Sequence, residues 1–172
     1  MNDRFAHHLR LDQIRDGERL DLIADDGERR AVADRLGLGG LDRLEAHAVL
    51  SRSGAVVRAE GRIVAALEQS CVVTGEPVAA HIDEAFALMF VPEPRDSAPD
   101  AEIELGAEDC DIVFYDGAAI DLGGAIADTL ALSLDPYPRS AGAEAALREA
   151  GVLNEEQAGP FAALAKLRKS DS

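Results

Sequence analysis

The side chains of this sequence that could bind a metal ion are few and scattered. A structural zinc ion takes four nitrogen or sulfur ligands, which usually come from closely spaced pairs. The available ligands lack that paired spacing: Cys71, Cys110, His7, His8, His47 and His81. We therefore expect no metal site and no cofactor, and we interpret each cysteine as a structural thiol.

A cysteine nucleophile would need a neighbouring base to activate it. His81 could approach Cys71 across a hairpin, but on its strand His81 has the opposite parity from the large apolar residues, which indicates a solvated histidine. One acidic series lacks the spacing and the central glycine of an EF-hand, and we interpret it as a solvated loop, with contact to a protein partner as the functional alternative. It comprises Glu102, Glu104, Glu108, Asp109, Asp111 and Asp116.

The glycine-rich segments offer no phosphate-binding loop, because Gly37-Leu38-Gly39-Gly40 is not followed by Lys-Ser or Lys-Thr. Gly123 and Gly124 lie in the first turn of a predicted helix, where backbone N–H groups could bind an anion or the chain could pack closely against a sheet. We favour close packing. With no clustered acid, base or nucleophile, we expect that the chain is not an enzyme and has no small-molecule substrate.

Three arginines could contact phosphate. Arg58 and Arg62 project on the same side of one predicted strand, and Arg52 lies near the turn before it. Phosphate contact is one interpretation of this group. The other is a solvated sheet face in which Glu60 alternates with the arginines.

The elements that must position these residues follow from the spacing of apolar side chains. Alternation predicts strands over 20–23, 44–50, 55–66, 71–74, 78–91 and 112–115, and Glu84 interrupts one apolar face, which indicates a bulge or an edge position. Helices are predicted over 28–36 with Asp26 as N-cap, over 121–134 with Asp121 as N-cap, and over 144–149. A basic amphipathic end follows at 161–169.

The composition indicates a strongly acidic protein with an aliphatic core. The net charge is −16, and the first 70 residues hold 11 arginines against 13 acids, so most of the excess acid lies further along the chain. Such a charge repels polyanions and argues against broad, nonspecific nucleic-acid binding. No apolar run approaches the roughly 20 residues of a membrane span, and we expect a cytoplasmic protein without membrane contact.

Two stretches together resemble the YceD family, whose members are known as large ribosomal RNA subunit accumulation proteins. They are Gly61–Val78, with the sequence Ser-Cys-Val-Val-Thr-Gly-Glu-Pro at 70–77, and Ile120–Arg139, and the ending Gly159-Pro-Phe-Ala-Ala-Leu-Ala-Lys-Leu167 also fits. Many relatives have a second cysteine where this chain has Thr74, so no metal or redox property is carried over. The matching positions have no role that the resemblance assigns: Cys71, Glu76, Pro77, Asp121, Leu122, Asp135 and Pro136.

The resemblance implies a non-enzymatic role in 23S ribosomal RNA accumulation and large-subunit biogenesis. The partner is then 23S rRNA or its precursor, bound locally, as an assembly intermediate, or through ribosomal proteins. The alternative is an acidic adaptor for a basic ribosomal protein, without direct RNA contact. The candidate contact residues are basic: Arg52, Arg58, Arg62, Arg139, Lys166, Arg168 and Lys169.

We expect an α+β fold, with an antiparallel, barrel-like or strongly curved sheet, a few packing helices and an acidic mobile loop. A single domain over 1–172 would have its core at about 20–139, the acidic loop at about 92–108 and a helical tail at about 140–169.

Overall fold

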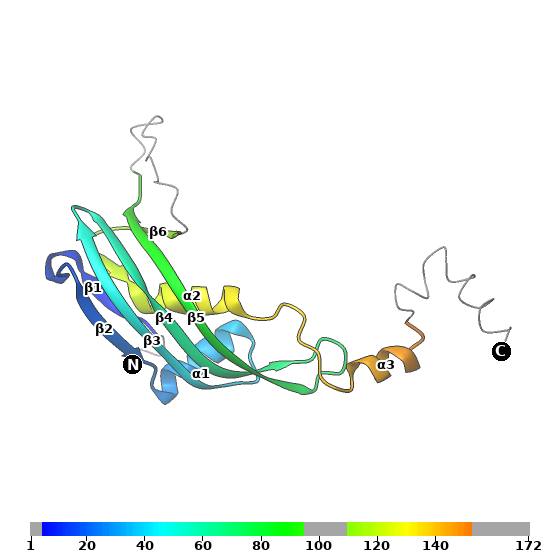
Figure 1. Cartoon of the computed structure of the whole chain (residues 1–172). Helices are drawn as coiled ribbons and strands as arrows, with labels where there is room; N and C mark the ends of the chain where they lie inside the picture. The colour runs from blue at the N-terminus through cyan, green and yellow to red at the C-terminus, as the bar shows by residue number, and fades with distance from the viewer. Residues whose placement is uncertain (1–4, 95–109, 153–172) are drawn as a thin grey trace. The chain divides into compact units, whose positions relative to one another are not determined.

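The computed structural model describes residues 5–94 and 110–152 of the chain (Figure 1). These residues divide into two compact units, one within 1–69 and 79–136 and one within 70–78 and 137–172. The helices and strands follow in the order β1 (His8–Arg10), η1 (Leu11–Gln13), β2 (Glu18–Ile23), α1 (Asp26–Leu36), β3 (Gly40–Ser53), β4 (Val56–Ser70), β5 (Pro77–Pro92), β6 (Asp111–Tyr115), β7 (Ala119–Asp121), α2 (Leu122–Ser133) and α3 (Ala143–Glu149).

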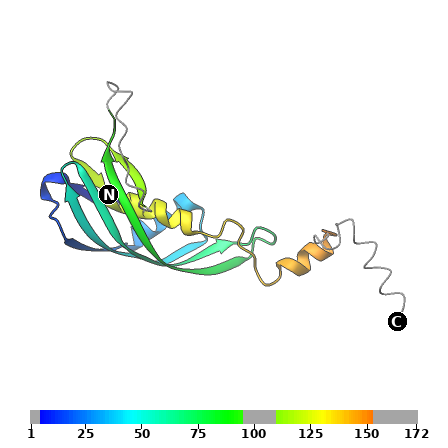
Figure 2. The same cartoon turned by 45° about the horizontal axis from the view of Figure 1, so that its top comes forward.

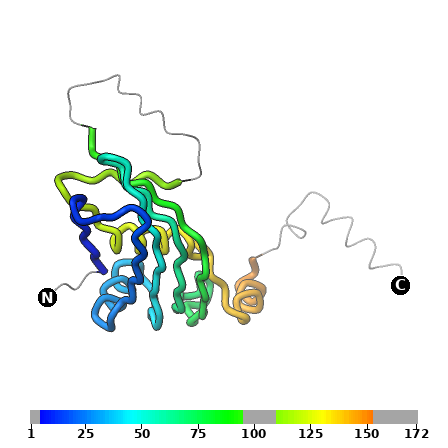
Figure 3. The backbone as a smooth tube through the Cα atoms, turned by 60° about the vertical axis from the view of Figure 1, so that its left-hand side comes forward, coloured from blue at the N-terminus to red at the C-terminus, as the bar shows by residue number. Residues whose placement is uncertain are grey.

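The first unit is built on an open five-stranded sheet with the strand order β2-β3-β4-β5-β6. The pairs β2–β3 and β3–β4 are antiparallel, whereas β6 runs parallel to β5. In Figure 3 the long strands run side by side, with α2 in yellow along one face. Strands β1 and β7 form a separate two-stranded antiparallel sheet.

The α+β class is confirmed, but the prediction of a barrel-like or strongly curved sheet is wrong. The two ends of the strand order, β2 and β6, do not pair with each other, so the sheet remains open. Helix α2 buries the apolar face of the sheet and takes the place of the opposite wall that a barrel would supply. Covering one face in this way leaves the other face of an antiparallel sheet free to be polar.

The alternation of apolar and polar residues along β3 and β4 produces a sheet with one buried face. Ala46 lies opposite Ile63, and both are buried, whereas their neighbours His47 and Arg62 lie opposite each other and are exposed. This register fixes which side chains face solvent, since a slip of one residue would exchange the two faces.

Glu84 interrupts the buried face of β5, and its position explains why. Among the described residues, β6 pairs with β5 over Leu88–Pro92, so Glu84 precedes the paired stretch and has the edge position that was one of the two predicted alternatives. The Ser133 hydroxyl of α2 donates a hydrogen bond to the Glu84 carboxylate over 3.1 Å.

Helix α1 begins and ends with the predicted kinds of residue. The Asp25 side chain accepts from the Glu28 backbone N–H, and Glu28 accepts from the Asp25 N–H, so the N-cap is one residue earlier than the predicted Asp26. Gly37 ends the helix with a φ of 65°, in the left-handed conformation that glycine adopts without steric cost.

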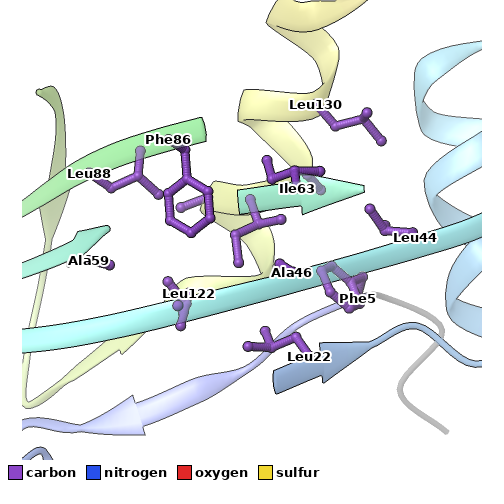
Figure 4. Packing of buried hydrophobic residues seen from close by; sticks show 14 of the residues in the cluster. Phe5, Leu22, Leu44, Ala46, Ala59, Ile63, Phe86, Leu88, Leu122 and Leu130 are labelled. Atoms are coloured by element: carbon purple, nitrogen blue, oxygen red, sulfur yellow. The ribbon is translucent and has the colours of Figure 1, made fainter. Parts of the chain in front are cut away.

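The core of the first unit is mostly aliphatic, as its composition predicts, with Phe5, Phe86, Phe90 and Tyr115 as its aromatic members. Leu122, Ile126 and Leu130 of α2 recur at intervals of four and are fully buried. Figure 4 shows Leu122 and Leu130 among side chains of the strands, including Ile63 and Leu44. Full burial of one such side chain contributes about 1.5–3 kcal/mol, so this stripe accounts for a large part of the stability of the helix on the sheet.

The second unit contains a turn, a connecting segment and α3. The predicted strand at 71–74 is wrong, because the Cys71 carbonyl accepts from Gly75 N–H and the Cys71 N–H donates to the Glu76 carbonyl, which closes a turn. The predicted helix at 144–149 is confirmed as α3. Most of the acidic loop at 92–108 and the basic end at 161–169 lie outside the described residues.

No helix within 5–94 and 110–152 is both long enough and apolar enough to cross a membrane.

Candidate functional site

The face of the five-stranded sheet that points away from the core carries most of the charged side chains of its strands. We call this surface the outer face. It comprises the exposed or half-exposed side chains at alternate positions: Arg19, Asp21 and Ile23 on β2, Arg43, Glu45, His47 and Val49 on β3, Arg58, Glu60 and Arg62 on β4, His81 and Asp83 on β5, and Ile112 and Phe114 on β6. Arg58 and Arg62 therefore share a face, as their spacing predicts.

Sequence reasoning missed Arg43 as a member of this group. It lies on β3 opposite Ala66 of β4, after a register shift between Leu41 and Arg43. That irregularity places Arg43 on the outer face, although simple alternation from Leu41 would turn it toward the core. Four arginines of the outer face thus come from β2, β3 and β4.

Each of three outer-face arginines contacts a carboxylate. Arg43 lies 2.7 Å from Glu45 and Arg58 lies 2.7 Å from Glu60 on the same strand, and Arg62 reaches from β4 to Asp83 on β5. These pairs make the outer face a charge-balanced surface on an otherwise acidic molecule.

The histidines of the outer face also lie beside acids. The His47 Nδ1 atom is 2.6 Å from Asp21 on the neighbouring strand. His81 is exposed on β5, as predicted, and it contributes to the field around Asp83. Both histidines are therefore exposed side chains of the outer face.

The ion pairs of Arg62 and Arg43 favour the charged forms of Asp83 and Glu45. The hydrogen bond from Arg62 lowers the pKa of Asp83, and the hydrogen bond from Arg43 lowers the pKa of Glu45. Asp83 in turn raises the pKa of Arg62 through the same hydrogen bond. A phosphate that binds these arginines must displace an ionised carboxylate.

The remaining predicted contact residues do not join Arg58 and Arg62. The Arg52 guanidinium donates to the backbone carbonyls of Gly54, at 2.9 Å, and of Leu11, so it fastens the turn between β3 and β4. Arg139 is exposed in the second unit. Lys166, Arg168 and Lys169 lie outside the described residues.

The second unit has a polar cluster around Cys71. The Glu76 carboxylate accepts hydrogen bonds from the hydroxyls of Thr74, at 3.1 Å, and Ser140, at 2.6 Å. The Val72 N–H donates to the Pro138 carbonyl over 2.9 Å. These bonds fasten residues 138–140 to the turn at 71–76, and sequence reasoning did not identify Thr74 and Ser140 as partners because they are 66 residues apart.

The Cys71 thiol has an unusual acidity within this cluster. Burial raises its pKa, but hydrogen bonds to the sulfur from Thr74 and Ser140 outweigh that effect and lower the pKa to about 6. The Thr74 N–H lies 3.4 Å from Sγ. Since the residue is only 3% exposed, the thiolate is stabilised where large reagents cannot reach it, which favours a structural role.

Asp121 and Leu122, which match the family pattern, connect the N-terminal segment to α2. One oxygen of Asp121 accepts from the N–H groups of His7, at 2.9 Å, and Gly124, at 3.0 Å. The Leu122 N–H donates to the His7 carbonyl, and its side chain is fully buried. Asp121 thus caps the helix and holds the segment before β1.

The two glycines after Leu122 are explained by close packing, but against the segment before β1 and the Asp121 side chain and not against the sheet as predicted. A Cβ on Gly123 would lie 2.8 Å from the Phe5 carbonyl oxygen and the His7 nitrogen, and a Cβ on Gly124 would lie 2.4 Å from the Asp121 carboxylate. The Asp121 carboxylate occupies the position at the helix N-terminus where an external anion would bind. The structure therefore does not support an anion site at Gly123 and Gly124.

The other family-pattern positions lie at the ends of elements. The Asp135 carbonyl accepts a hydrogen bond from the Gln69 side-chain amide over 2.9 Å, and Pro136 follows after α2 has ended at Ser133. Pro77 begins β5. Across the described part of the chain, no three His, Cys, Asp or Glu side chains gather as metal ligands would.

Comparison with known proteins gives one match. The family model described as large ribosomal RNA subunit accumulation protein YceD matches residues 59–168, from β4 to beyond α3. No curated protein and no solved structure matches the chain. The matched range covers more than half of the chain and includes the Cys71 turn, Asp121 and α2, so this chain belongs to the YceD family of large ribosomal RNA subunit accumulation proteins.

Proposed function

We propose that this chain supports the accumulation of 23S ribosomal RNA as a non-enzymatic, cytoplasmic factor that contacts the RNA, or an assembly intermediate, through the outer face. The observation that carries the proposal is the placement of Arg43, Arg58 and Arg62 on adjacent strands of one uncovered sheet face. The family description names a role in ribosomal RNA accumulation and no reaction, and it therefore supports a non-enzymatic role.

The existing ion pairs do not prevent phosphate contact. Exposed ion pairs contribute about 0–1 kcal/mol each, so displacing Asp83 from Arg62 or Glu60 from Arg58 costs little compared with a charge-assisted hydrogen bond to phosphate. Residues four apart on a strand lie about 13 Å apart, so Arg58 and Arg62 can contact the phosphates of two separate nucleotides. The net charge of −16 opposes a larger RNA footprint.

A second candidate function is that of an acidic adaptor that binds a basic ribosomal protein without touching RNA. The carboxylate partners of the outer-face arginines favour it, because a surface that carries carboxylates also attracts cationic side chains. The two candidates differ in whether a partner remains bound after the RNA is digested.

Cross-linking in cells distinguishes them. We expect RNA cross-linked to the wild-type chain to be enriched in 23S precursor, and the double variant Arg58→Glu/Arg62→Glu to recover less of it. The matched control is Arg30→Glu/Arg35→Glu, which makes the same change in net charge on α1. Circular dichroism establishes that each variant is folded.

Equal RNA recovery by the outer-face variant and the α1 variant would contradict RNA contact through the outer face. Protein partners that persist after nuclease treatment and dissociate with added salt would favour the adaptor, because screening weakens contacts between exposed charges.

A further inference from the structure

Strand β6 leaves one edge of the five-stranded sheet unpaired by any other described strand. The Glu93 N–H donates to the Tyr115 carbonyl over 2.9 Å, so the backbone groups of Tyr115 point toward β5. Backbone groups alternate in direction along a strand, and those of Ile112 and Phe114 therefore point away from β5. Figure 2 shows β6 beside the end of β5. The edge offers two N–H and two C=O groups in the geometry that a further strand requires.

The side chains of the same two residues are exposed and apolar. Phe114 is 56% exposed and Ile112 is 38% exposed, whereas Val113 and Tyr115 pack toward the core. An added strand could thus gain both backbone hydrogen bonds and apolar contact from Ile112 and Phe114.

The opposite edge of the sheet is protected in a way that β6 is not. The Ala24 N–H donates to the Leu44 carbonyl, so the outward-pointing residues of β2 are Arg19, Asp21 and Ile23. Two of these three carry charges, which is how natural sheets prevent unwanted strand pairing. The outward-pointing residues of β6 carry none.

The chemistry around β6 selects the kind of strand that would add. Asp111 begins β6 and Asp116 follows it, and both are exposed; the exposed Glu93 follows the end of β5, and its N–H binds Tyr115. These three acids attract a cationic segment and repel a nucleic-acid backbone.

We infer that β6 is a docking edge for an extended, basic segment of a protein partner, which pairs with Ile112 and Phe114 as a sixth strand. Its alternate apolar side chains contact Phe114 and Ile112 on the outer face, and its lysine or arginine residues face Asp111, Asp116 and Glu93. The inference goes beyond RNA contact through Arg58 and Arg62, which lie on β4, and it holds whether or not those arginines bind RNA.

Titration of the full chain with labelled peptides tests the inference. The probe is a fluorescein-labelled nonapeptide of alternating lysine and valine, followed by fluorescence anisotropy. We expect it to bind, whereas a peptide with glutamate in place of lysine and a peptide with a central proline should not, because the first reverses the charge and the second cannot form a strand. Amide exchange should slow at Ile112 and Phe114, whose N–H groups point outward.

Matched edge variants separate this surface from the rest of the molecule. Phe114→Lys should weaken binding of the lysine–valine peptide about tenfold through like-charge repulsion and the lost apolar contact. Ile23→Lys makes the same kind of change on β2, where Ile23 is 68% exposed, and should leave binding unchanged. Arg58→Glu/Arg62→Glu should not weaken it either, even if that variant no longer binds RNA.

Three results would overturn the docking edge. They are equal binding of the proline-containing peptide, unchanged exchange at Ile112 and Phe114 while the peptide is bound, and slowed exchange at those amides by oligouridine instead of the peptide. The last result would identify β6 as an RNA contact.

Discussion

At the scale of residues, the hydrogen bonds around Cys71 and Glu76 stabilise the structure of the second unit. Among the described residues, the Cys71 thiol has the largest pKa shift, and the two residues that hydrogen-bond to it, Thr74 and Ser140, also bind Glu76. The hydrogen bond from Ser140, followed by that from Thr74, lowers the pKa of Glu76 as well. Thr74 and Ser140 therefore contact two anionic side chains, and we interpret these hydrogen bonds as stabilising the second unit.

The acidity of Cys71 can be measured in a Cys110→Ser background, where it is the only thiol. Ultraviolet absorbance of the thiolate should titrate with a midpoint of about 6, and Ser140→Ala should raise the midpoint because the anion loses a donor. A midpoint near that of an ordinary cysteine thiol, about 8.5, would contradict the hydrogen-bonded thiolate.

The same pKa shift predicts how stability depends on pH. Because the folded-state pKa lies below the unfolded-state pKa, ionisation of Cys71 stabilises the fold fully above the unfolded-state value, and the effect is lost as the pH falls through about 6. The difference in unfolding free energy between the wild type and Cys71→Ser should therefore grow as the pH rises from 6.

Gly61 is fixed by a close approach of two strands. A Cβ at this position would lie 1.8 Å from the His47 carbonyl oxygen on β3, which is a backbone atom and cannot move aside alone. We predict that Gly61→Ala lowers the free energy of unfolding by about 1–3 kcal/mol, as overpacking does. Urea unfolding measures the change.

The matched control for Gly61 is Gly40→Ala on β3, where no heavy atom lies within 4 Å of the added Cβ. This substitution should change stability by less than about 0.5 kcal/mol. Equal effects of the two substitutions would show that the close approach at Gly61 is not a constraint.

At the scale of elements, α2 and the segment before β1 depend on each other through Asp121. We predict that Asp121→Ala lowers the free energy of unfolding by about 2 kcal/mol, the upper end of the range for an N-cap, because two backbone N–H groups lose their acceptor. Asp25→Ala removes a cap that accepts from one N–H and should cost about 1 kcal/mol. Thermal or urea unfolding of both variants tests the order, and a larger loss for Asp25→Ala would contradict it.

Local patterns predicted most strands and helices of this fold. The alternation along β3, β4 and β5 and the four-residue spacing of Leu122, Ile126 and Leu130 are direct consequences of burial on one face. The strand predicted at 71–74 was wrong because Val72 and Val73 favour strands locally, whereas hydrogen bonds from Cys71 close a turn. Strands β1 and β7 have three residues each, too few for a period to be visible.

The open sheet could not be predicted from the same patterns. A barrel and an open sheet both need alternating strands, and they differ in whether the first and last strands pair with each other, which depends on partners far apart in the sequence. Here β6 pairs parallel to β5 and α2 covers the buried face, and neither fact has a local sequence signal.

At the scale of the whole molecule, the distribution of charge decides which partners can bind. The sequence predicted that Arg58 and Arg62 share a face, and they do. It could not predict the carboxylate that pairs with Arg62, because Asp83 lies 21 residues away on another strand, and it could not predict that Arg52 binds backbone carbonyls. The RNA contact proposed for this chain therefore involves a few arginines of the outer face, on a molecule of net charge −16.

We propose that the outer face acts in the accumulation of 23S ribosomal RNA. The most direct test is the ratio of 23S to small-subunit ribosomal RNA in cells that lack this protein, restored with the wild type, Arg58→Glu/Arg62→Glu or Arg30→Glu/Arg35→Glu. We predict that the ratio falls without the protein and is restored by the wild type and the α1 variant but not by the outer-face variant. An unchanged ratio in cells without the protein, or full restoration by the outer-face variant, would contradict the claim.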